Sequence, residues 1–401
     1  MASTISLMAR RLHTSVNQHE RWRGSECLNL IPSENITSPA VRALLGSDLG
    51  HRYTARDSYY MGTKYLDEIE AVCEELAKRV FGCKYADVRP LSGHHCNMIA
   101  TMSFTRASDS VLSVSPRDGG YPGLSHEGLG KILHLKNLYF PFDSDRMNIK
   151  EREATNLIKK EKPRLITFGA SFILLPHPVA QLLKSSTEAV NIYDGSHVLG
   201  LIAGNEFQDP LREGCDLLIG STHKSFFGPQ GGLILTNNDE IWQKLVGNIH
   251  PGLVDNIHWN RIAGLAHSLL EFLRYGKAYA KQVVTNAKYL GRTLSELHLP
   301  LKAASLGFTR SHQLILDLPD DGERFRLAHG LEEAGIIVDR GIRLGTSEVT
   351  RRGMKEDQMS VVANLISDIF RRRSRSEQVA RAVKKLVREF STVEYSLDRP
   401  G

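Results

Sequence analysis

The sequence lacks two features that would place it in common classes of protein. No apolar run approaches the roughly 20 residues that a transmembrane helix needs, so a membrane protein is not expected. The cysteines show no C-x-x-C pair and no histidine spacing typical of zinc, so neither a metal site nor a disulfide framework is expected. They are Cys27, Cys73, Cys83, Cys96 and Cys215. Such cysteine usage fits a reducing compartment, and we expect a cytoplasmic protein.

The excess of positive charge is small and local. The 51 Lys and Arg residues against 45 Asp and Glu residues give a net charge of +6, and much of the surplus lies in "RRRSRS" at 371–376 and in residues 9–23. No nucleic-acid-binding motif accompanies these arginines, which favours a solvated face over a nucleic-acid partner. The first 19 residues contain no acidic residue and only faintly resemble a transit peptide, so we expect an N-terminal helical arm.

The apolar pattern predicts an α/β fold. The segment "DEIEAVCEELAKRVFG" places Ile69, Val72, Leu76, Val80 and Phe81 on one helical face, and it ends in a basic turn and a glycine. Five short apolar runs follow: "DSVLSVS", "RLITFGA", "AVNIYD", "DLLIGST" and "GGLILTN". Helix-length segments separate most of them, an alternation that predicts strands of a largely parallel sheet.

The length and the later pattern predict two domains. A chain of 401 residues is too long for one ordinary domain. After about residue 275 the pattern changes to a long helix, a mixed segment and two terminal helices with apolar stripes. We therefore expect an arm at 1–40, a large domain at 41–275 and a smaller C-terminal α/β domain at 276–401.

Polar residues follow several of the predicted strands. "NIYDGSH" ends one strand with Asp194 and brings His197 shortly after it. The next strand ends at Ser221, and Lys224 follows in "GSTHKSFFGPQGG". Ligands in open α/β sheets bind at the carboxyl ends of the strands, so we expect these side chains to meet.

An aspartate, a lysine and a phosphate cradle are what pyridoxal phosphate requires. The loop "LSGHHCN" offers Ser92 and Gly93 at a helix start, where backbone N–H groups bind phosphate. The lysine amine condenses with the cofactor's aldehyde, and the carboxylate keeps the pyridine nitrogen protonated, so that the ring draws electrons from Cα of an amino acid. A lysine with its usual pKa of about 10.4 is a poor nucleophile at neutral pH, so we expect Lys224 to be buried.

Five segments resemble, in order, the signature segments of serine hydroxymethyltransferases. They are "LNLIPSENITSPAVR", "SYYMGTKYLDEIE", "IYDGSHVLGLIAG", "GSTHKSFFGPQGG" and "GIRLGTSEVTRRGM", and the resemblance spans about residues 25–390. The resemblance implies a fold type I pyridoxal-phosphate enzyme, with a mostly parallel sheet in the large domain. It also implies a homodimer or tetramer whose active sites lie between subunits.

The resemblance assigns roles to individual residues. Lys224 would bond to the cofactor, Asp194 would hold the pyridine nitrogen, and His197 would lie at O3′. Arg343 in "GIRLGT" matches the arginine that holds the substrate α-carboxylate, a task suited to a bidentate guanidinium. The further cofactor contacts would be Ser92, Gly93, Tyr121, Ser171, Ser221, His223 and, from the neighbouring subunit, Gly252. The substrate pocket would include Ser33 with Tyr53 and Tyr60, the tyrosines coming from the partner chain.

The departures from the family pattern lie where the family contacts folate. "RYTARDSYY" is shorter than the family segment and lacks its proton-handling glutamate, although Asp57 is nearby. "IIVDRGIR" passes almost directly from strand to arginine, without the family's loop and asparagine beside the pterin. Tyr121 stands in place of the ring-stacking histidine, with His126 following, and Gln230 replaces an arginine.

These departures spare the amino-acid and cofactor contacts. We therefore expect a folate-independent aldolase or transaldolase that makes or breaks the Cα–Cβ bond of β-hydroxy amino acids, giving glycine and an aldehyde. The alternatives are a hydroxymethyltransferase using folate or a modified pterin, a pyridoxal-phosphate aminotransferase or racemase, and a non-catalytic binding protein. For the base at the hydroxyl group, the sequence leaves open His126, His94, His95 and a tyrosine such as Tyr60.

Overall fold

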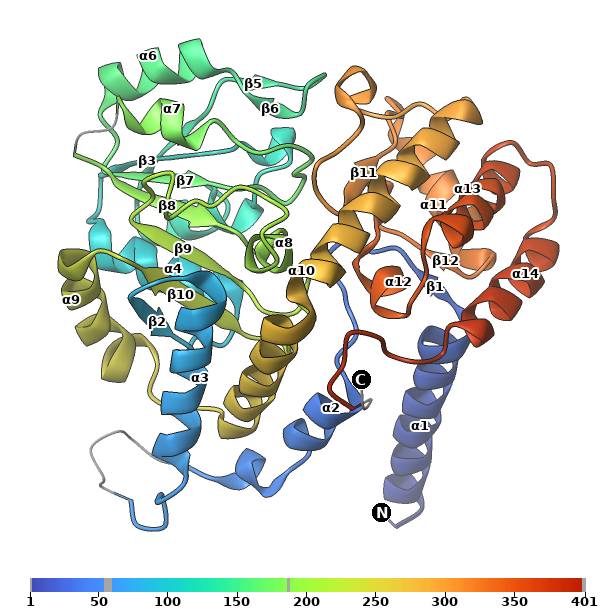
Figure 1. Ribbon diagram of the computed structural model, residues 1–401, viewed down its shortest axis with the longest axis horizontal. Coiled ribbons are helices and arrows are strands. Elements are labelled where there is room, and N and C mark those ends of the chain that lie inside the picture. Colours follow the sequence, from blue (N-terminus) through green and yellow to red (C-terminus); the bar gives the residue numbers. More distant parts are fainter. Residues whose placement is uncertain (1, 54–59, 186–187, 399–401) are drawn as a thin grey trace.

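A seven-stranded sheet forms the centre of the larger part of the molecule. The computed structural model describes residues 2–53, 60–185 and 188–398 (Figure 1). In these ranges the strand order is β2–β10–β9–β8–β7–β3–β4. The strands are β2 (Tyr85–Asp87), β3 (Ser110–Ser113), β4 (Lys136–Tyr139), β7 (Leu165–Phe168), β8 (Val190–Asp194), β9 (Leu217–Ser221) and β10 (Gly232–Thr236).

The predicted sheet is confirmed, with one difference in strand direction. The five apolar runs form β3, β7, β8, β9 and β10. Neighbours from β9 to β4 are parallel, whereas β10 is antiparallel to both β9 and β2. Strands β7, β9 and β10 are buried throughout, because helices cover both faces of the sheet (Figure 1).

Helix α3 (Leu66–Phe81) confirms the predicted helix and its end. Gly82 follows it with a φ of 61°, the left-handed conformation that closes many helices. The buried stripe runs through Leu66, Cys73 and Leu76, whereas Val72, expected on this face, is 43% exposed. Val72 is one position before Cys73, so its side chain lies at the edge of the stripe.

The smaller part has a core of its own. Strands β11 (Gln313–Ile315) and β13 (Arg343–Gly345) pair antiparallel, and β1 (Leu28–Asn29) pairs parallel with β12 (Ile336–Ile337). Helices α11 (Asp321–Glu333), α13 (Glu356–Phe370) and α14 (Ser376–Glu389) pack around them (Figure 1). The predicted apolar stripes of α13 and α14 lie in this core, together with Leu28 and Leu30 of the N-terminal segment.

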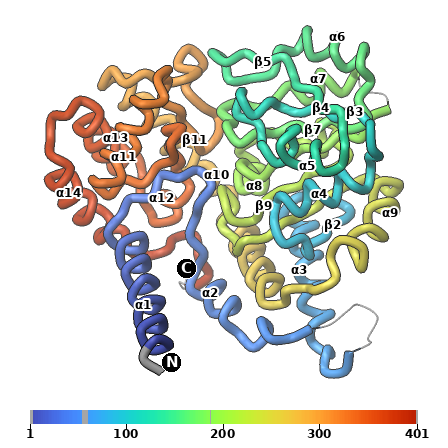
Figure 2. Tube along the Cα trace, turned by 180° about the vertical axis from the view of Figure 1, so that it is seen from behind, coloured from blue at the N-terminus to red at the C-terminus, as the bar shows by residue number. Residues whose placement is uncertain are grey.

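Helix α10 (Trp259–Glu296) connects the two parts. It is 38 residues long and contributes buried side chains to both cores, so the expected boundary at 275/276 falls within a continuous helix. Helix α1 (Ala2–Arg21) projects from the side of the smaller part, and the chain then crosses to α2 (Pro39–Leu45) (Figure 2).

The remaining helices and strands are short or lie around the sheet. They are η1 (Trp22–Glu26), η2 (Asp48–His51), α4 (Gly93–Phe104), η3 (Pro116–Asp118), η4 (Pro122–Leu124), α5 (Leu129–Ile132), β5 (Phe142–Asp143), β6 (Asn148–Ile149), α6 (Glu151–Glu161), α7 (Val179–Leu183), α8 (Leu199–Ala203), α9 (Asp239–Gly247), η5 (Asn248–Leu253), η6 (Ala304–Leu306) and α12 (Ser347–Arg351).

The loop after β7 joins the larger part to the smaller one. The Ile173 carbonyl accepts a hydrogen bond from the Ser311 hydroxyl at 2.6 Å, and the Leu174 carbonyl accepts one from Arg310 N at 2.8 Å. Gln313 Oε1 accepts from Ile173 N at 3.4 Å. These bonds place the start of β11 beside the loop that follows β7.

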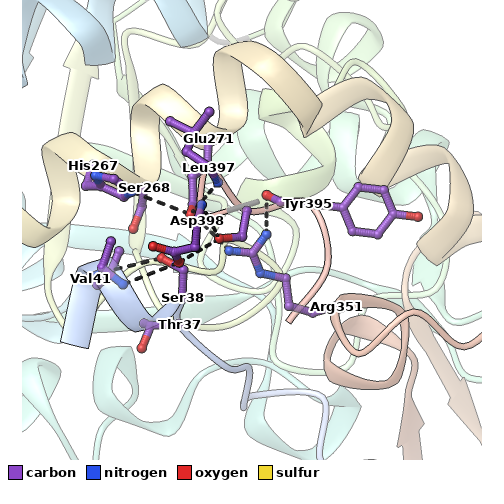
Figure 3. A network of polar contacts seen from close by, with 12 residues as sticks. Thr37, Ser38, Val41, His267, Ser268, Glu271, Arg351, Tyr395, Leu397 and Asp398 are labelled. Carbon is purple, nitrogen blue, oxygen red and sulfur yellow. Dashed lines mark hydrogen bonds and ion pairs between the residues drawn. The ribbon is translucent and has the colours of Figure 1, made fainter. Parts of the chain in front are cut away.

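A buried ion pair attaches the C-terminal segment to α10 (Figure 3). Arg351 Nη2 lies 2.6 Å from Glu271 Oε2, and neither side chain is exposed to solvent. Leu397 N donates to Glu271 Oε1 at 3.3 Å, and Asp398 Oδ2 accepts from Ala40 N at the start of α2. The pair thus connects α12, α10 and the C-terminal segment.

Two further findings concern the classes of protein considered above. Within the described ranges, no helix combines the length and the apolar character required to cross a bilayer. The five cysteines have free thiols, and no group of three metal-ligating side chains occurs among the residues that the structure describes.

Replacing Glu271 with Gln tests the buried ion pair. Arg351 would keep its charge without a carboxylate partner, and an uncompensated buried charge lowers the free energy of unfolding by about 3–5 kcal/mol. Denaturant titration of the purified protein measures this loss. Glu75→Gln removes the partner of Arg79 in an exposed pair on α3 and is the matched control, for which we expect an unchanged midpoint. Equal midpoints for the two variants would contradict the structural role of Glu271.

Candidate active site

A pocket of about 430 Å³ lies at the carboxyl ends of β7, β8 and β9. Residues following each of these strands contribute to it, together with the first turns of α4 and the loop around residue 121. Its lining is Gly93, His94, Asn97, Tyr121, Leu124, Gly169, Ala170, Ser171, Asp194, Ser196, His197, Ser221 and Lys224. The structure therefore brings together eight of the residues proposed from the sequence: Gly93, His94, Tyr121, Ser171, Asp194, His197, Ser221 and Lys224.

Asp194, the last residue of β8, is held by two donors. Asn97 Nδ2 donates to Oδ2 at 2.8 Å, and Ser196 N donates to Oδ1 at 3.0 Å. The neighbouring strand approaches so closely that a Cβ at Gly169 would lie 2.1 Å from the Asp194 carbonyl. Asn97 was not found from the sequence, although its position one helical turn after Gly93 on α4 points it toward the same pocket.

Lys224 lies on the loop between β9 and β10. Its carbonyl accepts from Asn35 Nδ2 at 2.8 Å, and the same amide nitrogen lies 2.9 Å from the Tyr279 hydroxyl, which donates to the Ser225 carbonyl at 3.1 Å. Burial lowers the pKa of the Lys224 amine, and the nearby Asp194 carboxylate partly opposes this shift. A lowered pKa makes this amine easier to deprotonate than a solvent-exposed lysine, in line with the burial expected from the sequence. Asn35 and Tyr279 carried no sequence signal.

The start of α4 forms an anion-binding corner with two hydroxyl groups. The Ser92 hydroxyl caps the helix by accepting from His95 N at 3.0 Å, and the helix begins at Gly93. A Cβ at Gly93 would lie 2.3 Å from Ser221 Oγ and 2.7 Å from Ser196 Oγ, so a larger residue does not fit. The free N–H groups of the first turn and these hydroxyls suit a phosphate. Ser196 was missed by the sequence reasoning.

His197 is a buried, neutral imidazole. Gln313 Nε2 lies 2.9 Å from Nδ1, so this nitrogen accepts and Nε2 carries the proton. Burial lowers the pKa of His197 well below its usual value, and the Lys224 charge adds to the shift. The ring stacks on His312 at a centroid distance of 6.0 Å. His223 lies outside the pocket lining, and burial lowers its pKa to about 4.

Arg343 lies beside the pocket at the start of β13. Nη1 donates to the Ser171 carbonyl at 2.6 Å, and Nε donates to Asp339 Oδ2 at 2.7 Å. The guanidinium carbon lies 4.4 Å from the centre of the Phe172 ring. Ser33 follows Pro32, which packs against Gly345 of the same strand. Arg343 therefore faces the loop after β7, and Asp339 and Phe172 are partners that the sequence reasoning missed.

Three residues expected from a partner chain lie elsewhere. The Tyr53 hydroxyl donates to Asp255 Oδ2 at 2.8 Å, and the Tyr53 and Tyr60 rings meet at 5.0 Å with both side chains exposed. Gly252 is in η5, three positions before Asp255. None of the three lines the pocket of the same chain. Asp57 lies outside the described residues.

The histidines considered as a base differ in position. Both ring nitrogens of His95 bond to backbone groups, at 3.2 and 3.1 Å. His126 is exposed and lies outside the pocket lining, with Nδ1 3.1 Å from the Tyr139 hydroxyl. His94 lines the pocket, and its ring lies 5.8 Å from that of Tyr121. Of these three histidines, His94 is the one placed to reach a ligand.

The donors of the pocket fit the functional groups of pyridoxal phosphate. Lys224 supplies an amine with a lowered pKa for the aldehyde, and Asp194 supplies a fixed carboxylate for the pyridine nitrogen. At Gly93, the first N–H groups of α4 lie beside the hydroxyls of Ser196 and Ser221, a set of donors suited to a phosphate. Each group of the cofactor therefore has a matching partner in the pocket.

Comparisons with known proteins agree with this chemistry. The family model described as "Serine hydroxymethyltransferase" matches residues 10–366. A relative named serine hydroxymethyltransferase from Methanocaldococcus jannaschii is 42% identical and covers 96% of this chain and 94% of its own length. One of the same name from Korarchaeum cryptofilum is 39% identical over 97% of this chain and 96% of its own. The crystal structure of L-threonine transaldolase from Pseudomonas fluorescens, in the internal aldimine state, has a TM-score of 0.91 at 27% identity and covers 99% of this chain and 96% of that one.

Replacing Lys224 with Ala tests the assignment of the amine. We expect the variant to form no covalent bond with pyridoxal phosphate, because no other amine lines the described pocket. Borohydride reduction followed by mass spectrometry of the chain measures the bond. Lys244→Ala, an exposed lysine on α9, is the control and should keep the full mass increment. A cofactor adduct in the Lys224 variant would place the reactive amine elsewhere.

Proposed function

The chain belongs to the serine hydroxymethyltransferase family, and we propose that it is a folate-independent aldolase or transaldolase acting on β-hydroxy amino acids. It is a pyridoxal-phosphate enzyme, as the family and the transaldolase of similar structure indicate. The observation that carries the proposal is the short connection between β12 and β13, residues 338–342. The chain passes from the strand to Arg343 without the family's pterin-facing loop, while the residues facing the cofactor and the amino acid are retained.

Arg343, Lys224 and Asp194 have different roles in the proposed reaction. Pyridoxal phosphate, when bound, supplies an electron sink for the charge that develops at Cα. Arg343 orients the amino acid through its α-carboxylate. Lys224 would hold the cofactor through its side-chain amine. When not bonded to the cofactor, this amine would accept a proton from the substrate, because burial lowers its pKa and favours the unprotonated form. Asp194, held by Asn97, would pair with the pyridine nitrogen.

Proton transfer at the β-hydroxyl group requires a side chain inside the pocket. His94 and Tyr121 line it together. Burial raises the pKa of the Tyr121 hydroxyl, so this group stays protonated and acts as a donor. The geometry therefore supports His94 as the acceptor in preference to His95 and His126.

An oligomer with shared active sites is part of the proposal. Tyr53 and Tyr60 contact each other beside Asp255, away from the pocket of their own chain. This grouping supports an assembly in which they complete a partner's pocket, as the family resemblance implies. The substrates we propose are a small amino acid and an aldehyde, with no nucleic acid or membrane as partner.

Hydroxymethyl transfer to folate or a modified pterin is the second candidate. The names of the relatives from M. jannaschii and K. cryptofilum favour it, since both are called serine hydroxymethyltransferase. The short 338–342 connection favours the folate-independent reaction.

Cleavage of L-threonine is the first test of the proposal. Purified protein loaded with cofactor should release acetaldehyde and glycine in equal amounts, and a second added aldehyde should be converted into a new β-hydroxy amino acid. Coupled aldehyde detection and chromatography of the amino acids measure both products. The Lys224→Ala protein is the control for uncatalysed cleavage. Formation of a keto acid or a D-amino acid instead would favour the aminotransferase or racemase alternative.

Addition of tetrahydrofolate separates the two candidate reactions. With L-serine as substrate, we expect no acceleration of glycine formation and no saturable binding in a calorimetric titration, because the pterin-facing loop is absent. A saturable acceleration would show that the short 338–342 connection still permits pterin binding and would establish the hydroxymethyltransferase reaction.

A further inference from the structure

Asp339 lies in the turn between β12 and β13 and accepts two hydrogen bonds from Arg343. Oδ2 accepts from Nε at 2.7 Å, and Oδ1 accepts from the Arg343 backbone N at 3.2 Å. Ile342 N also donates to the Asp339 carbonyl at 3.0 Å. The turn is tight, since a Cβ at Gly341 would lie 3.1 Å from Phe172 and 3.2 Å from Asp339 Oδ1. The tight turn that contains Asp339 thus holds the Asp339 carboxylate against the Arg343 side chain.

The guanidinium of Arg343 is restrained at Nε, at Nη1 and on one face. Asp339 binds its Nε side and the Ser171 carbonyl binds Nη1, and both contacts act in the plane of the group. Phe172 packs against its face, with 4.4 Å between the guanidinium carbon and the ring centre. The Arg343 and Asp339 side chains are only 12% and 24% exposed, so solvent weakens this pair little.

These contacts leave one edge of Arg343 free for a ligand. A guanidinium has five N–H groups, and a carboxylate binds it in pairs, either through Nη1 and Nη2 or through Nε and Nη2. Asp339 occupies Nε, which removes the second mode. Ser171 uses one of the two N–H groups of Nη1, so the second N–H of Nη1 and both N–H groups of Nη2 have no partner among the residues that the structure describes.

We propose that Asp339 is a positioning residue that fixes Arg343 so that the substrate's α-carboxylate binds only through the outer Nη1–Nη2 edge. The inference rests on the proposed function, in which Arg343 holds that carboxylate. Asp339 also has an opposing effect, because its negative charge weakens the attraction between Arg343 and any carboxylate. A test must therefore separate the hydrogen bond from the charge.

Two variants that both lack the charge make this separation. In Asp339→Asn the side-chain oxygen still accepts from Nε, whereas Asp339→Ala removes the acceptor. We expect Asp339→Ala to bind glycine about tenfold more weakly than Asp339→Asn, the size of one hydrogen bond to a charged group. Spectral titration of the cofactor-loaded proteins gives the dissociation constants. Glycinamide, which lacks the carboxylate, should bind equally to both variants.

The outcomes distinguish this inference from the proposed function. If the wild-type protein binds glycine no better than glycinamide, Arg343 is not the carboxylate clamp and the proposed function fails. If the wild type prefers glycine but the Ala and Asn variants bind it equally, or if glycinamide weakens in parallel, the role of Asp339 alone is overturned. Should Asp339→Ala not fold, as judged by cofactor content and thermal melting, Asp339→Ser replaces it. Its hydroxyl is too short to reach Nε, and the same tenfold difference is expected.

Discussion

The carbonyl oxygen of Ser171 fixes the relation between the two halves of the site. It accepts hydrogen bonds from Arg343 Nη1 at 2.6 Å and from Gln313 Nε2 at 3.2 Å, and both side chains come from the β11–β13 ribbon of the smaller part. Gln313 in turn holds His197, which lines the cofactor pocket in the larger part. One backbone atom thus links Arg343, the proposed clamp for the amino acid, to the side chains of the proposed cofactor pocket. A shift of the loop after β7 would move both together.

Burial shifts the pKa values of the basic groups in the pocket, and hydrogen bonds offset the cost of burying its carboxylate. Desolvation lowers the pKa of both Lys224 and His197, so each is easier to deprotonate than it would be in water. The same desolvation would be unfavourable for Asp194 without donors, and Asn97 and the Ser196 amide supply them. The site therefore contains one stabilised negative charge beside a nucleophilic amine, the combination that a pyridinium ring with an aldehyde group requires.

The sequence predicted many of the side chains that line the pocket and missed several of those that hold them. Apolar runs ending in polar residues located Lys224 and Asp194, because strand ends in an α/β sheet meet at one edge. Asn35 and Gln313 are 189 residues before and 116 residues after the groups they contact, and no local pattern connects such pairs. Tyr53 and Tyr60 could not be placed in a pocket from one chain, because their predicted role belongs to a second copy.

The short turn at 338–342 bears on both parts of the proposed function. A longer connection would let the chain leave β12 and return to β13 at a distance from Arg343. In the short turn, the Asp339 carbonyl bonds to Ile342 N, which forces the Asp339 carboxylate back onto the Arg343 side chain. The proposed loss of pterin contacts and the restraint on Arg343 would therefore have the same structural origin, the short turn. An insertion in this turn would release Arg343 even if every residue of the pocket lining were kept, so we expect the length of the connection to affect amino-acid binding in the proposed reaction.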